Sequence, residues 1–272
     1  MTRCKPLLGT FVEISIHSID ASQQIAIDKA FTAVEKVQGL MGFHHQESEL
    51  SKINTLSHIR NIEIHPWTAQ VLRVAREVYD QSNGLFDCGV GHRLIAAGLL
   101  PGNLDLSQYE FGGIKDLVFV DSNIIFSNKP LCLDLGGIAK GFAVDIAVAS
   151  LLADGIESGY VNAGGDLRVF GSEAQAIQIR NPAIPTELID IGTLQHGAIA
   201  TSSLYFSKRE KQFTSYVVNP STNEHIDFSG SYSVIAKECI YADALTKVLA
   251  ISDKTNHPCF DHFSAQAIRI EV

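Results

Sequence analysis

The segment that most constrains the fold is residues 133–170, LDLGGIAKGFAVDIAVASLLADGIESGYVNAGGDLRVF. Two glycines, Gly136 and Gly137, open a stretch whose apolar residues recur at three-and-four spacing. This spacing is typical of a helix with one buried face. Gly155 ends the helix, and the pattern beyond it predicts two strands joined by a tight turn at 162–166.

A glycine-rich helix start has two interpretations. Its unpaired N–H groups lie at the positive end of the helix dipole, which suits a phosphate or another anion. Glycine also lets a flat ligand approach the main chain closely. Alternatively, the glycines only allow the helix to pack closely against a strand. A single glycine-rich turn is a weak signal, so spacing alone leaves both interpretations open.

Composition excludes several classes of protein. The chain has 272 residues, of which 46% are hydrophobic and 19% charged, as in an ordinary globular protein. Its formal net charge is −9 and it has no lysine or arginine cluster, which argues against nucleic-acid binding. No apolar run approaches the roughly 18 residues of a membrane span, so no membrane insertion is expected. The first residues lack the pattern of a secretory signal, which predicts a cytoplasmic protein.

The five cysteines are odd in number and scattered, with no Cys-x-x-Cys pair. This distribution favours reduced thiols over a disulfide framework or a zinc site. The typical motifs of serine hydrolases, zinc proteases and P-loop enzymes are also missing from the sequence. Paired histidines at His44-His45 could bind a metal, but a solvated loop is the expected interpretation.

The remaining pattern predicts more strands than helices. Helices are expected over 20–41, 47–54, 67–81 and 242–251; strands over 10–16, 62–65, 176–180, 189–193, 198–204, 213–218, 233–236 and 265–272; and a hairpin within 117–126. Because the strands come in hairpin-like pairs, the expected class is α+β, with mostly antiparallel sheets and packed helices. We expect a single domain over 1–272, with the polar stretch 101–113 as a candidate break between two lobes.

Four acidic residues lie near the ends of predicted elements: Asp87, Asp134, Asp166 and Asp243. Carboxylates at such corners can hold Mg²⁺ together with substrate phosphate oxygens. They also commonly cap helices and turns. Local spacing therefore suggests a site for an anionic ligand without defining its chemistry.

Several ordered blocks carry a family resemblance: Leu8-Gly9-Thr10, SELSKIN at 48–54, GLFD at 84–87, LDLGGIAKGFAVD at 133–145, NAGGD at 162–166, Thr201-Ser202, Asn219-Pro220-x-Thr222 and ADAL at 242–245. Through these blocks the chain resembles the FAD:protein FMN transferases, the ApbE family, over nearly its full length. The resemblance implies an α+β fold with a flavin cleft between two lobes. It also implies cleavage of FAD with Mg²⁺ and transfer of FMN to a threonine or serine of a transiently bound acceptor flavoprotein.

By position, the resemblance assigns FAD contacts to Leu8, Leu85, Phe86, Asp87, Gly136, Lys140 and Phe142. It assigns Mg²⁺ to the Asp243 carboxylate and the main-chain carbonyl of Ala139. Glycines at a helix start and an acidic helix corner fit these assignments physically.

Three positions depart from the family pattern. Lys247 stands four residues after Asp243, where the family has a threonine, and its ammonium could repel Mg²⁺ or partly replace it against phosphate oxygens. Tyr216 replaces a histidine, and a phenol is a poor base at neutral pH. Asn219 replaces an aspartate. Asp243, Lys247 and Tyr216 are the predicted catalytic residues; the alternatives are a non-catalytic FAD-binding carrier or assembly protein, or an FAD pyrophosphatase.

Overall fold

A seven-stranded antiparallel sheet forms the centre of the larger lobe in the computed structural model, which describes residues 1–17, 21–102, 106–107, 110–204 and 214–271. Its strands run in the order β1 (Thr2–Leu7), β2 (Thr10–Ile16), β6 (Gly159–Ala163), β7 (Asp166–Phe170), β10 (Gly197–Ser203), β11 (Ser231–Ala236) and β12 (Gln266–Ile270). Every neighbouring pair is antiparallel.

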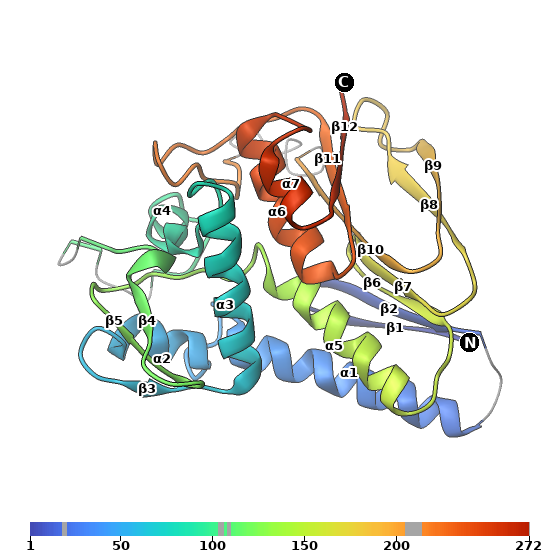
Figure 1. The fold of residues 1–272 in the computed structure, drawn as a ribbon, viewed down its shortest axis with the longest axis horizontal. Coiled ribbons are helices and arrows are strands. Elements are labelled where there is room, and N and C mark those ends of the chain that lie inside the picture. The colour runs from blue at the N-terminus through green and yellow to red at the C-terminus, as the bar shows by residue number, and fades with distance from the viewer. Residues whose placement is uncertain (18–20, 103–105, 108–109, 205–213, 272) are drawn as a thin grey trace.

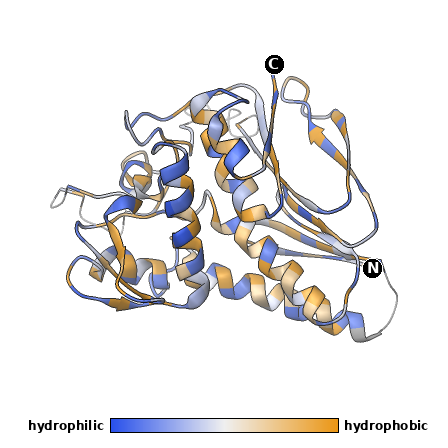
Figure 2. Cartoon of the chain, in the orientation of Figure 1, coloured by the Kyte–Doolittle hydropathy of each residue, from blue (hydrophilic) through white to orange (hydrophobic). Residues whose placement is uncertain are grey.

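Three helices cover one face of this sheet: α1 (Ala21–Met41), α5 (Ala139–Ala153) and α6 (Cys239–Ser252) (Figure 1). The sheet meets them with alternate residues, as in β2, where Val12, Ile14 and Ile16 are buried. Helix α5 packs between α1 and α6 and is buried on more than one side, which explains why Figure 2 shows it as mostly apolar. The sequence predicted a helix with a single buried face, so the structure buries more of α5 than its spacing indicated.

The opposite face of the sheet carries the hairpin of β8 (Gln175–Arg180) and β9 (Leu188–Leu194), which pair antiparallel to each other. Ile177 and Ile179 of this hairpin form a small second cluster with Ile199 of β10. The large sheet is therefore sandwiched, with the main core on its helical side.

The smaller lobe contains α2 (Glu49–Leu56), α3 (Pro66–Gln81), α4 (Gly91–Ala96) and a three-stranded sheet of β3 (Ile62–Glu63), β5 (Ile124–Ser127) and β4 (Leu117–Phe119) (Figure 1). Two 3₁₀ turns, Cys88–Val90 and Ile114–Asp116, complete it. Ser48 caps α2 by accepting a hydrogen bond from the Ser51 amide. Helix α7 (Pro258–His262) lies near the end of the chain, between α6 and β12.

The predicted α+β class and the antiparallel sheets are confirmed, with most element ends shifted by one or two residues. The strand predicted at 213–218 is wrong in its described part, because 214–218 contribute only an isolated bridge between Val218 and His225. Strand β1, which pairs with β2, was not predicted, because Arg3 and Lys5 interrupt its apolar pattern. Residues 20, 213 and 272 of predicted elements, and 103–105 and 108–109 of the candidate lobe break, lie outside the described residues. No described helix is long and apolar enough to cross a membrane.

Candidate functional site

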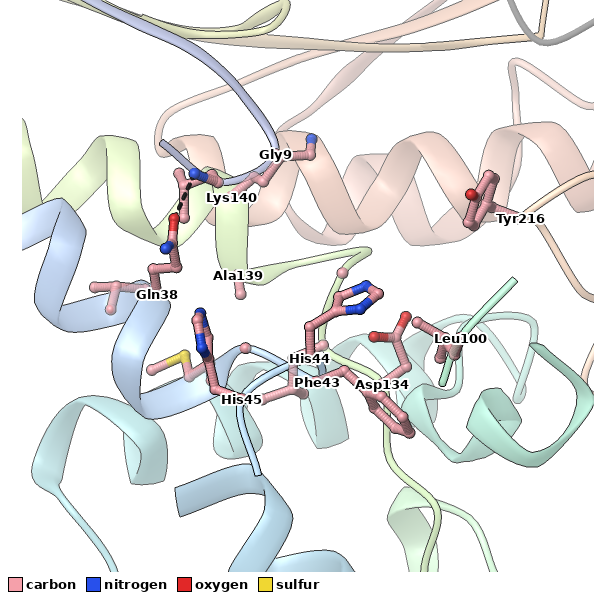
Figure 3. A pocket seen from close by; sticks show the side chains of 16 residues that line it. Gly9, Gln38, Phe43, His44, His45, Leu100, Asp134, Ala139, Lys140 and Tyr216 are labelled. Atoms are coloured by element: carbon pink, nitrogen blue, oxygen red, sulfur yellow. Dashed lines mark hydrogen bonds between the residues drawn. The ribbon is translucent and has the colours of Figure 1, made fainter. Parts of the chain in front are cut away.

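Two adjoining cavities lie beside the glycine-rich turn that leads into α5. Their volumes are about 430 Å³ and about 540 Å³. Their linings share six residues: Leu8, Gly9, Asp134, Gly136, Lys140 and Tyr216. The two spaces therefore form one divided site whose middle is the sequence block singled out above. Figure 3 shows the smaller cavity, which we call the first cavity.

The turn between β1 and β2 forms part of the shared lining. Leu7 pairs with Thr10, so Leu8 and Gly9 make a two-residue turn with φ values of 56° and 71°. Such positive values are required by the tight hairpin turn whose twist matches the strands, and they are unusual for leucine. The Leu8 amide donates a hydrogen bond of 2.6 Å to Gln38 Oε1 on α1, which fixes this turn against the first cavity (Figure 3).

Lys140 lies in the first turn of α5, three residues after Gly137. Its ammonium forms an ion pair with Asp166 at the start of β7, and the Asp166 side chain is only 3% exposed. Burial raises the pKa of Asp166 above its ordinary value, and the nearby Asp243 carboxylate raises it further. Burial alone would lower the pKa of Lys140, but the carboxylates of Asp166 and Asp243 raise it, so the lysine stays charged.

Asp243 and Lys247 face each other one turn apart on α6. The Lys247 Nζ contacts the Asp243 Oδ1, and it also donates a hydrogen bond of 3.0 Å to the main-chain oxygen of Asp243. The other carboxylate oxygen, Oδ2, accepts the Gly141 amide of α5 at 3.1 Å. Burial would raise the pKa of Asp243, but the ammonium groups of Lys247 and Lys140 lower it below its ordinary value. Asp243 is therefore a fully buried, ionised carboxylate.

Thr246, one place earlier than the family's threonine, faces another way. Its hydroxyl donates to the Asp243 main-chain oxygen at 2.7 Å and lies 2.8 Å from the Ser202 hydroxyl of β10. The side chain is fully buried and lines neither cavity. Thr246 therefore links α6 to the sheet and does not take over the missing threonine's position.

These contacts allow a test of whether the residues present fit the Mg²⁺ that the resemblance implies. Both oxygens of the Asp243 carboxylate already have partners, and one partner is itself a cation. An ammonium beside the same carboxylate repels a divalent ion. The described residues also contain no group of three or more histidine, cysteine, aspartate or glutamate side chains arranged for a metal. The arrangement at Asp243 does not fit Mg²⁺, and the assignment to Asp243 and Ala139 stays a prediction.

The GLFD block lines the second cavity through Leu85, Phe86 and Asp87. The Asp87 carboxylate accepts the amides of Gly89 at 2.7 Å and Ile114 at 2.9 Å, and burial raises its pKa. Asp87 therefore acts as the cap of the first 3₁₀ turn and holds the wall of the cavity in place.

The structure places two other predicted residues very differently. Phe142 is 1% exposed, packs edge-on against Trp67 and lines neither cavity, so it supports the site through the core. Tyr216 is 57% exposed and lines both cavities, so its side chain borders them while staying open to solvent. Ala139 lines the first cavity.

Sequence reasoning missed part of the first cavity. His44 and His45 lie exposed in a loop, as predicted, and they also line the first cavity together with Gln38 (Figure 3). Burial raises the pKa of Asp134, and the nearby His44 opposes this shift. Asp134 was singled out as a corner residue, but only the fold shows that both cavities meet at it.

A sandwiched antiparallel sheet with a divided cavity at a glycine-rich, lysine-bearing helix start defines the class, an α+β protein whose candidate site lies where a helix start favours anionic groups. The family model described as "ApbE family" matches residues 8–260. The chain belongs to the ApbE family.

Curated relatives include an FAD:protein FMN transferase of Rhodobacter capsulatus, which is 26% identical over 93% of this chain. Another is an FAD:protein FMN transferase of Vibrio cholerae serotype O1, 28% identical over 80% of this chain. The chain spans about half (51%) of the length of the first relative and 70% of the second.

Among solved structures, an ApbE protein from Thermotoga maritima superimposes with a TM-score of 0.86 at 24% identity, covering 99% of this chain and 93% of that one. A variant of the flavin transferase ApbE from Vibrio cholerae gives 0.82 at 25% identity, covering 100% and 94%. These likenesses confirm the ApbE-type fold.

Proposed function

We propose that this protein is an FAD:protein FMN transferase, which cleaves FAD and passes FMN to a threonine or serine of an acceptor flavoprotein. The observation that supports it most is the divided cavity, whose two parts share Gly136 and Lys140. FAD has a matching form, with two flat ring systems joined by a pyrophosphate. The names of the relatives above support the same activity.

In this proposal the pyrophosphate lies over the turn at Gly136-Gly137, beside the ammonium of Lys140. Unpaired amides at a helix start favour phosphate oxygens, and a glycine Cα lets them come close. The cap residue of α5, Ile138, makes no side-chain hydrogen bond. The Ala139 amide donates to the Leu135 carbonyl and the Gly141 amide to Asp243 Oδ2, which leaves the Lys140 amide available to a ligand among the described residues. The two ring systems occupy one cavity each.

Transfer then needs one displacement at phosphorus. The acceptor hydroxyl oxygen bonds to the phosphorus of the FMN half, and the bond from that phosphorus to the bridging oxygen breaks. AMP leaves with the bonding electron pair, and the hydroxyl proton passes to solvent. Lys140 and Lys247, which both line the second cavity, stabilise the negative charge that grows on the bridging oxygen. Holding the acceptor hydroxyl in line with the breaking bond supplies most of the remaining rate enhancement.

The acceptor is a transient partner and approaches the cavities from the side where Tyr216 is exposed. At this position a phenol can donate a hydrogen bond to a phosphate oxygen or orient the acceptor hydroxyl. The Mg²⁺ predicted from the resemblance would neutralise phosphate charge if bound, but the displacement does not pass through it. The cytoplasm stays the predicted compartment.

The experiment is incubation of the protein with FAD and the acceptor flavoprotein of one of these relatives. We expect AMP by chromatography and flavin fluorescence that remains with the acceptor on a denaturing gel. Replacing the acceptor's threonine by valine should abolish the fluorescence. Release of FMN and AMP to water would instead indicate a pyrophosphatase, and recovery of intact bound FAD would contradict catalysis.

A further inference from the structure

We propose that the Lys247 ammonium is the resident cation of the pyrophosphate site, so that this protein binds and cleaves FAD without a divalent metal. The inference rests on the proposed function, because the ligand it concerns is FAD. The residues around Asp243 do not fit Mg²⁺, and the charged side chain of Lys247 lies beside this carboxylate instead.

The geometry at Asp243 is that of an occupied cation site. Lys247 Nζ contacts one carboxylate oxygen and the main-chain oxygen of the same residue, which are the two kinds of oxygen a hard cation takes from a protein. The remaining carboxylate oxygen is held by the Gly141 amide. All three Asp243 oxygens therefore have partners, and one ammonium serves two of them.

Lys247 also reaches the ligand space. Its side chain is 20% exposed and lines the second cavity together with Lys140 and Gly137. A Cβ at Gly137 would lie 3.2 Å from Lys247 Cε, so the missing side chain leaves room for the lysine stem beside the glycine-rich turn. An ammonium has three protons to donate, and Asp243 accepts two of them in the described structure. The third is available to a phosphate oxygen.

Charge balance supports the same conclusion. Lys140 neutralises Asp166, and Lys247 neutralises Asp243, so both buried carboxylates have a cation from the chain itself. Without Lys247, a negative charge on Asp243 would have no exposed surface and no neighbouring cation on α6 to compensate it. Such a charge is costly in the interior and would attract a cation from solution. An ordinary exposed pair along a helix would not have this consequence, because water screens it.

The first test measures metal binding directly, with Mn²⁺ as the probe and electron paramagnetic resonance as the readout, with and without FAD. The wild type and the matched control Lys254→Thr, an exposed lysine just beyond α6, should show no saturable site that depends on Asp243. Lys247→Thr should gain one Mn²⁺ site, at least about tenfold tighter than any in the wild type. A stoichiometric Mn²⁺ site in the wild type that Asp243→Asn removes would overturn the proposal.

The second test measures FAD affinity, and AMP release in the presence of the acceptor flavoprotein, in EDTA and in Mg²⁺. Wild-type affinity should change less than about twofold between them, whereas Lys247→Thr should lose about tenfold or more in EDTA and recover it with Mg²⁺. Lys247→Arg, which keeps the charge, should remain independent of metal. Wild-type affinity or AMP release that requires Mg²⁺ would overturn the inference and leave the proposed function standing.

If no variant cleaves FAD in either buffer, the proposed function fails, while the Mn²⁺ and FAD titrations still decide where the cation comes from. If Lys247→Thr does not fold, the wild type and Lys247→Arg decide the question through the same titrations, because metal-dependent FAD binding by either contradicts the proposal.

Discussion

Two neighbouring carboxylates in the site, Asp166 and Asp243, have pKa values shifted in opposite directions, because their charged neighbours differ. Asp166 is buried near Asp243, and together burial and repulsion raise its pKa although Lys140 contacts it. Asp243 faces two ammonium groups and accepts an amide, which lower its pKa despite burial. Asp134 is penalised chiefly by burial. Replacing a single charged residue of the site should therefore change both its affinity for the ligand and the free energy of unfolding.

Lys140→Met removes the cation that neutralises Asp166 and lines both cavities. We expect FAD affinity to fall at least about tenfold. The free energy of unfolding should fall by about 2–3 kcal/mol, less than for a fully buried pair because Lys140 is one-third exposed. Flavin fluorescence titration and urea unfolding measure the two effects. Lys52→Met, at an exposed position on α2, is the control, and equal losses in both variants would contradict the assigned role of Lys140.

Asp134→Asn should stabilise the protein at neutral pH. The folded pKa of Asp134 is raised, so folding favours the protonated form; its contribution is present at low pH and lost as the pH rises through the folded pKa. Asparagine stays neutral and can still accept the Gly136 amide. The melting temperature of the variant should therefore exceed that of the wild type at pH 7 by about 2–4 °C for each kcal/mol gained. The difference in melting temperature between variant and wild type should disappear below about pH 4. A difference that grows on acidification would contradict this prediction.

At the scale of elements, the site depends on how α5 and α6 meet. The first amides of α6, at Cys239 and Ile240, donate to the carboxylate of Asp145 on α5, at 2.9 and 2.8 Å. Glu238, at the cap position of α6, makes no such bond with its side chain. Gly141 lets the helices touch, since a Cβ there would lie 2.8 Å from that of Asp243 and would clash with the Cys239 carbonyl. One helix therefore caps and positions the other.

Asp145→Ala should destabilise the fold by about 3 kcal/mol or more. It removes the cap of α6, a loss of about 0.5–2 kcal/mol, and it leaves Arg168 of β7 without its buried partner. The matched control is Asp154→Ala at the end of α5, whose ion pair with Lys29 is exposed and should contribute less than about 1 kcal/mol. Urea unfolding midpoints at constant m-value compare the two, and similar midpoints would refute the capping role of Asp145.

The sequence predicted the helices and strands better than it predicted the contacts between them. Helix α3 and the hairpin at β4 and β5 follow from periodicity and turn residues, which are local properties. Asp145 lies inside a predicted helix, and nothing local shows that it caps a helix about 95 residues further along the chain. Phe142 was assigned to FAD through the family resemblance, whereas the structure buries it in the core, where it lines neither cavity. His44 and His45 have no local signal and line the cavity through the packing of the lobes.

At the scale of the whole molecule, one hydrophobic core crosses both lobes. Leu72 and Ile125 of the smaller lobe belong to the same cluster of buried residues as Ile14 and Val161 of the large sheet. The single tryptophan, Trp67, lies in the first turn of α3 and packs against Phe142 of α5 at 6.4 Å between ring centroids. Its ring also faces Lys36 of α1. Trp67 therefore reports directly on the contact between the lobes.

We expect the two lobes to unfold together. Since the core is continuous, urea titrations followed by Trp67 fluorescence and by far-ultraviolet circular dichroism should give coincident midpoints. FAD should shift both curves equally, because a ligand that binds only the folded state stabilises the whole cooperative unit. A Trp67 transition that precedes the circular dichroism transition would show that the lobes separate before they unfold.

The pair of Asp243 and Lys247 lies within one helical turn of a single element, and this has a physiological consequence. Under the proposal made here, the cation of the site is synthesised with the chain and becomes fixed when α6 docks, so no ion has to be acquired afterwards. Flavin attachment would then proceed at the same rate when a cell is starved of magnesium as when it is replete. Acceptor flavoproteins that depend on this protein would then receive FMN in magnesium-poor media in which a metal-requiring homologue is inactive.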